Sequence, residues 1–191
     1  MKNLITILIL TFASQFINAQ KFIETDRYVV VNKVTEKQQE YTAFFDIISI
    51  GNNAQKVTTI GVSDLDTFDG IVINVLPNPN LENIKEIIRI DTNYSACCGH
   101  TDAYYIMVTD DNDFISLPKI ENTYCDEAVS EVQYIFPKQA FGKENMVIKT
   151  EITYSANIEN VKSTKILQSL VWNDDIFNDG ETIAYSQINK R

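Results

Sequence analysis

The sequence predicts an all-β protein of mostly antiparallel sheet, arranged as a two-layer sandwich, with a small barrel or a propeller-like sheet as the alternative. Short segments rich in Val, Ile, Thr, Tyr and Phe alternate in polarity with a period of two, and turn residues separate them. No heptad pattern or low-complexity tract competes with this pattern. The segments are Arg27–Val31, Thr42–Ile50, Lys56–Val62, Ile71–Leu76, Ala103–Val108, Val132–Phe136, Met146–Tyr154, Lys165–Trp172 and Thr182–Ile188.

The first nineteen residues have the pattern of a secretory signal peptide. Lys2 gives a positive start, Leu4–Ala13 is apolar except for threonine, and Ala19 is the small residue expected before cleavage. The apolar run is about ten residues, whereas a membrane-spanning helix needs about twenty. We therefore expect a secreted or periplasmic protein, with residues 1–19 removed and residues 20–191 forming one domain.

Turn chemistry supports antiparallel hairpins between successive strands. Gly51-Asn52-Asn53 lies between two predicted strands, and Asp110–Asp113 has the composition of a polar hairpin tip. Phe68-Asp69-Gly70 ends another loop. Sequential hairpins of this kind predict an antiparallel sheet.

The segment Leu81–Ile90 fits two secondary structures. Leu81, Ile84 and Ile88 would share one face of a helix, whereas Ile84, Ile88 and Ile90 would share one face of a strand. Isoleucine is β-branched and favours extended backbone. We therefore predict a strand that follows one polar turn.

Charge restricts the class of partner. The chain carries a formal charge of -10 at pH 7, and loss of Lys2 with the signal peptide makes the mature chain one charge more negative. Nucleic acid and anionic membranes reward clustered Lys and Arg, so neither is expected as a partner. A basic protein fits better. Because no nucleophile elbow such as Gly-x-Ser-x-Gly is present, the first hypothesis is a non-enzymatic binding protein, an inhibitor or immunity-type factor for a basic macromolecule.

The three cysteines predict one disulfide in an oxidising compartment. We expect Cys98 to pair with Cys125, with Cys97 as the alternative partner, because neighbouring side chains of an extended chain point to opposite sides. A closed loop of about 27 residues would stabilise the fold by about 3 to 4 kcal/mol. A metal site at Cys98 and the single histidine, His100, is a weaker alternative, because the spacing matches no strong zinc pattern.

The loop from residue 64 to residue 70 suggests a weak calcium site. Asp64, Asp66 and Asp69 alternate in a manner that resembles Asp-x-Asp-x-Asp-Gly loops. Phe68 stands where the third carboxylate belongs, and position twelve is Val75 in place of glutamate. The functional alternative that follows is a calcium-dependent structural or adhesion module.

A hydrolase with a carboxylate pair is the second functional alternative. Such an enzyme needs two acids about 5 to 10 Å apart across a cleft. The chain contains 26 Asp and Glu residues, so sequence alone does not select a pair.

Overall fold

The computed structural model describes residues 20–33, 42–51, 54–125, 130–155, 161–173 and 176–179. The predicted signal peptide and the predicted strand Thr182–Ile188 lie outside these residues. Every described element is a strand, so the predicted all-β, mostly antiparallel class is confirmed. The strands are β1 (Lys21–Ile23), β2 (Tyr28–Lys33), β3 (Ala43–Ser49), β4 (Gln55–Val62), β5 (Phe68–Leu81), β6 (Ile84–Tyr94), β7 (Gly99–Thr109), β8 (Phe114–Ser116), β9 (Ile120–Tyr124), β10 (Ser130–Ile135), β11 (Met146–Tyr154), β12 (Val161–Asn173) and β13 (Ile176–Asp179).

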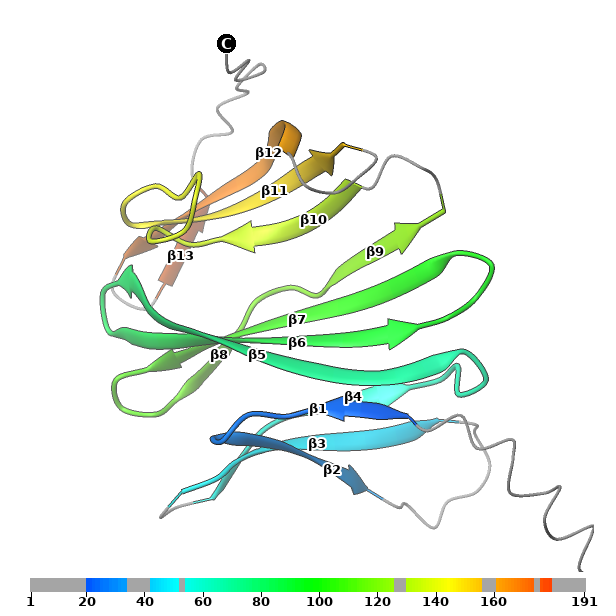
Figure 1. The fold of residues 1–191 in the computed structure, drawn as a ribbon. Helices are drawn as coiled ribbons and strands as arrows, with labels where there is room; N and C mark the ends of the chain where they lie inside the picture. Colours follow the sequence, from blue (N-terminus) through cyan, green and yellow to red (C-terminus); the bar gives the residue numbers. More distant parts are fainter. Residues whose placement is uncertain are drawn as a thin grey trace, which may run out of the picture.

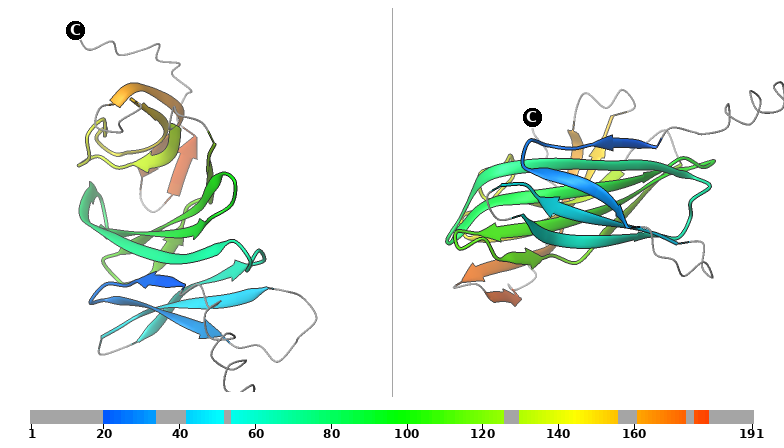
Figure 2. Two further views of the ribbon diagram at one scale, coloured as in Figure 1. Left: turned by 45° about the vertical axis from the view of Figure 1, so that its right-hand side comes forward. Right: turned by 90° about the horizontal axis from the view of Figure 1, so that it is seen from below.

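The strands form three open sheets stacked in sequence (Figure 1). The central sheet has the order β1-β5-β6-β7-β8, and β9 also pairs with β7. The N-terminal sheet contains β2, β3 and β4, and the C-terminal sheet contains β10 to β13. Two further views show the C-terminal and N-terminal sheets on opposite faces of the central sheet (Figure 2). The sandwich therefore has a third layer beyond the two that the sequence suggested.

The central sheet is buried on both faces, and this explains the composition of β6. Ile88 and Ile90 belong to the core shared with the N-terminal sheet, whereas Ile87 belongs to the core shared with the C-terminal sheet. The exposed fractions of Ile87 and Ile88 are 1% and 0%. A strand covered on both sides needs apolar residues at successive positions, so period-two alternation is lost.

Two hydrophobic cores hold the layers together. Burial of each large aliphatic or aromatic side chain contributes about 1.5 to 3 kcal/mol. The core between the central and N-terminal sheets includes Phe45, Ile47, Ile60, Ile71, Ile73, Ile88, Ile90 and Ile106. The core between the central and C-terminal sheets includes Ile87, Tyr105, Met107, Tyr134, Phe136, Val147 and Trp172.

The β5–β6 hairpin confirms the predicted strand at residues 81–90. Leu81 pairs with Ile84 across a turn at Glu82 and Asn83, and the φ angle of Asn83 is 58°. Asparagine tolerates this left-handed conformation better than most residues. The Asp110–Asp113 tip likewise joins two antiparallel strands, β7 and β8.

Gly70 allows β1 to join the central sheet. β1 pairs in parallel with β5, and Lys21 lies opposite Gly70. The φ angle of Gly70 is 150°, and a Cβ at this position would lie 1.9 Å from the backbone oxygen of Lys21. Only glycine fits both the conformation and the close approach. β5 already begins at Phe68, with an irregularity between Phe68 and Gly70, where the sequence predicted the end of a loop.

Candidate functional site

A cavity of about 440 Å³ opens between the ends of the central and N-terminal sheets. Its apolar wall is formed by Ile50, Val108 and Phe114, and its polar lining includes Glu86 and Asp111. This volume and this mixture of walls are typical of sites for small ligands or protruding side chains.

Glu86 is a buried carboxylate that joins two sheets at this cavity. The register of the β6–β7 pair shifts between Ile84 and Glu86, and Glu86 extends toward the N-terminal sheet. The Tyr28 hydroxyl donates a hydrogen bond of 2.5 Å to Glu86 Oε1, and Arg27 forms an ion pair with Oε2. The Glu86 side chain is 4% exposed, whereas that of Arg27 is 48% exposed. Burial and the hydrogen bond to Glu86 raise the pKa of Tyr28 well above its usual value.

Among the residues that line this cavity, the carboxylates Glu86 and Asp111 are matched by the cations Arg27 and Lys85, and the excess of acid comes from residues next to them in the chain. Lys85 lines the cavity, and its ammonium group donates a hydrogen bond to Asn112 Oδ1. Asp111 lines the mouth, and three more exposed acids, Asp26, Asp110 and Asp113, adjoin lining residues in the chain. We call Asp26, Asp110, Asp111 and Asp113 the acidic rim. The rim attracts cations over long range, since its charges are exposed and of one sign.

The structure brings Cys98 and Cys125 together as a disulfide, with a Cα–Cα distance of 4.6 Å. Gly99 and Tyr124, the adjacent residues, pair across β7 and β9. The bond therefore closes the end of that strand pair. Cys97, the alternative partner, is a free and exposed thiol.

His100 is held between two side chains of the central sheet. Its Nε2 lies 2.9 Å from Asp102 Oδ1, and its Nδ1 lies 3.2 Å from Thr123 Oγ1. Lys119 Nζ lies 3.1 Å from Asp102 Oδ2, which balances the carboxylate. Burial, and next the charge of Asp102, raise the pKa of Tyr94, which packs against the His100 ring, to about 12. Both ring nitrogens of His100 therefore already have partners, and Cys98 is committed to the disulfide.

Two of the three predicted calcium ligands, Asp64 and Asp69, already accept hydrogen bonds from protein groups. Asp64 accepts hydrogen bonds from the backbone N–H of Thr67 at 3.3 Å and from its hydroxyl at 2.7 Å. The side-chain hydrogen bond is the main reason that the pKa of Asp64 is lowered. Asp69 accepts a hydrogen bond from the Ser95 hydroxyl. In the part of the chain that the structure describes, no three His, Cys, Asp or Glu residues, Asp66 included, gather to hold a metal ion. The calcium site stays a prediction from sequence.

Sequence reasoning missed Arg27 and Glu86. The available signal was Glu86 itself, an acid that follows Lys85 between the isoleucines at positions 84, 87 and 88. An acid at such a position is rarely buried without a partner. The partner, Arg27, is distant in the chain, and only the stacking of the sheets identifies it.

Comparison with protein-family models, with curated proteins and with solved structures found no match. Across the described residues, none of the secondary structure is a helix with the length and apolar character needed to cross a bilayer.

Proposed function

We propose that this chain is an exported, non-enzymatic binding protein that engages a basic macromolecule through the acidic rim and the cavity beside it. The observation that carries the proposal is the position of the rim. Asp110, Asp111 and Asp113 occupy one hairpin tip, directly beside a 440 Å³ cavity. The rim provides long-range attraction, and the cavity provides a place for a protruding side chain.

The cavity suits the side chain of a lysine or arginine. Such a side chain combines an aliphatic stem with a charged end. Ile50, Val108 and Phe114 can pack against the stem, while Asp111 meets the charge at the mouth. Glu86 contributes less, because Arg27 already neutralises it.

The experiment compares two triple variants of the mature chain that change the same charge at different places. Asp110→Asn/Asp111→Asn/Asp113→Asn removes most of the rim, and Asp64→Asn/Asp66→Asn/Asp69→Asn removes three exposed acids from the loop before β5 and from β5 itself. Each is used as bait for proteins of the cell's own exported fraction, at low and then moderate salt. We expect the unmodified chain and the second variant to retain a basic protein that the rim variant loses.

Two further measurements decide the result: the salt dependence of retention and a titration with the purified partner. Exposed charges are screened over about 10 Å at 0.1 M salt, so the retained protein should be released as salt rises. Binding of that protein, once purified, should weaken at least tenfold for the rim variant in a titration. Equal losses for both variants would indicate attraction by net charge alone, and equal retention would contradict a role for the rim.

A further inference from the structure

A second, smaller cavity lies between the central and C-terminal sheets, away from the acidic rim. Its volume is about 140 Å³. Leu76 and Ile87 from the central sheet and Phe136 from the segment after β10 give it apolar walls. Arg89 and Tyr105 also line it, and both carry hydrogen-bond donors. Asn74, Gln133 and Gln139 complete the polar part of the lining, so the cavity has an apolar side and a polar side.

The Tyr105 hydroxyl is an unused buried donor. Tyr105 is 3% exposed; its oxygen accepts a hydrogen bond from the backbone N–H of Tyr134, but its own proton has no acceptor within the part of the chain that the structure describes. The buried Tyr28 hydroxyl is satisfied by Glu86, and that of Tyr134 by the backbone oxygen of Pro118 at 3.2 Å. Buried polar atoms are almost always paired, so an orphan beside a cavity indicates that something else supplies the acceptor.

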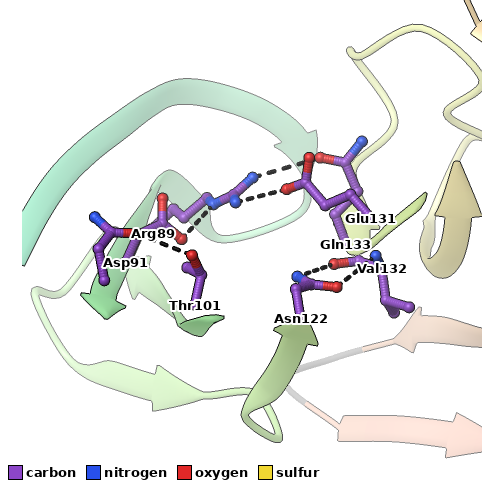
Figure 3. Close-up of polar contacts among 8 residues, drawn as sticks. Arg89, Asp91, Thr101, Asn122, Glu131, Val132 and Gln133 are labelled. Carbon is purple, nitrogen blue, oxygen red and sulfur yellow. Dashed lines mark hydrogen bonds and ion pairs between the residues drawn. The ribbon is translucent and has the colours of Figure 1, made fainter. Parts of the chain in front are cut away.

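Arg89 is a second donor that lines the cavity. Its charge is offset by the carboxylates that it contacts (Figure 3). Its Nε lies 2.8 Å from Asp91 Oδ1, and one terminal nitrogen lies 2.7 Å from Glu131 Oε1. The other terminal nitrogen has a long contact, 3.5 Å, to Gln133 Oε1. Two carboxylates therefore surround one guanidinium, and the group as a whole carries excess negative charge.

We propose that this cavity binds a small neutral molecule that joins a carbonyl acceptor to a compact apolar body, as in an aromatic or branched aliphatic amide. The carbonyl oxygen accepts from the Tyr105 hydroxyl and from the weakly engaged Arg89 nitrogen, and the apolar body packs against Leu76, Ile87 and Phe136.

Charge and volume both narrow the class of ligand. A carboxylate would meet Asp91 and Glu131 at close range, so an anion is disfavoured even beside Arg89. A cation would be repelled by the Arg89 guanidinium, which lines the cavity. An apolar cavity of about 150 Å³ holds benzene, so a ligand of about one ring fits a cavity of this size.

The test is an NMR titration of the full mature chain with benzamide, benzoate and toluene. We expect benzamide to bind at least fivefold more tightly than either of the others, with shifts concentrated on β6, β7 and β10. The matched variants are Tyr105→Phe and Tyr104→Phe, which remove the same atom from neighbouring residues of β7. Tyr104 packs against the core on the opposite face of that strand.

Tyr105→Phe should lower benzamide affinity about five- to tenfold, the loss of one hydrogen bond, and should leave toluene affinity unchanged. Tyr104→Phe should change neither. Tyr105→Phe also removes the acceptor of the Tyr134 backbone N–H, so its folding midpoint in urea is measured first and binding is compared where both tyrosine variants are fully folded. Equal binding of benzamide and toluene, or no binding of benzamide, would overturn the proposal and assign the orphan donor to water alone.

Discussion

The central sheet makes two interfaces of different character. Toward the N-terminal sheet it presents a core of isoleucine, valine and phenylalanine, and at one end the buried Glu86 forms an ion pair with the exposed Arg27. Toward the C-terminal sheet it presents an apolar core together with polar contacts along its length. These include Arg89 to Glu131, Asn122 to Val132, and the Trp172 indole to the backbone oxygen of Glu82.

The difference follows from the backbone N–H and C=O groups that need hydrogen-bond partners at each interface. Val132 lies on β10, which has β11 on one side and, among the described strands, no partner on the other. Its outward N–H and C=O would be unpaired next to a core, at a cost comparable to a lost hydrogen bond. The Asn122 amide accepts from Val132 N at 2.8 Å and donates to Val132 O at 3.0 Å (Figure 3). A side chain of one sheet thus completes the edge of another and fixes where it docks.

Among the variants that test this comparison, Arg89→Ala has the largest expected effect on stability. It leaves the buried Asp91 and the partly buried Glu131 without their cation, so we expect the free energy of unfolding to fall by about 3 to 5 kcal/mol in urea. A repair variant, Arg89→Met/Asp91→Asn/Glu131→Gln, should recover most of that loss, because it removes the charges together.

Ile88→Ala is the matched change on the opposite face of β6. A buried isoleucine truncated to alanine costs about 2 to 5 kcal/mol through lost burial and a cavity. When Ile88→Ala is combined with Asp91→Asn/Glu131→Gln, the cost of truncating Ile88 should stay the same, because Ile88 packs in the core on the other face of β6. If Arg89→Ala cost less than about 1 kcal/mol, the network would be no more important than a surface ion pair, and the contrast between the interfaces would be lost.

Asn122→Ala is expected to have an intermediate effect. It leaves two backbone groups of Val132 without partners, which should lower stability by about 1 to 3 kcal/mol. Hydrogen exchange gives the specific readout, since the Val132 amide should lose protection more than amides of the β11–β12 pair. Asn74→Ala, at an exposed position of β5, is the control and should change neither quantity. Retained protection at Val132 would show that the amide does not maintain this edge.

The sequence predicted strands best where one face is buried and the other is not. It missed β9 for a physical reason, because Asn122 is polar and 4% exposed at a position where alternation calls for an apolar residue. It also missed β8, a strand of three residues separated from β9 by a segment containing Pro118. The third layer was not predicted, because periodicity shows which faces are buried but not which sheets cover them.

The candidate sites were predicted unevenly for a related reason. Sequence analysis singled out Cys98, Cys125 and His100 because their residue types are rare in this chain. Glu86, Arg89 and Tyr105 belong to common types, and their importance comes from burial and from partners in other sheets. Such partners are fixed by stacking, which no local pattern in the sequence describes.

The smallest expected effect tests whether burial, and not charge pairing as such, distinguishes the Arg89 network. Lys165 and Glu151 pair across β12 and β11, with Nζ 3.9 Å from Oε2, and the lysine side chain is 71% exposed. Water and salt screen a pair of this kind, and holding two long side chains together costs entropy. We therefore expect Lys165→Ala to leave the unfolding midpoint in urea unchanged at both low and high salt. A loss approaching that of Arg89→Ala would mean that ion pairs stabilise the C-terminal sheet wherever they lie, and burial would no longer account for the difference between the two interfaces.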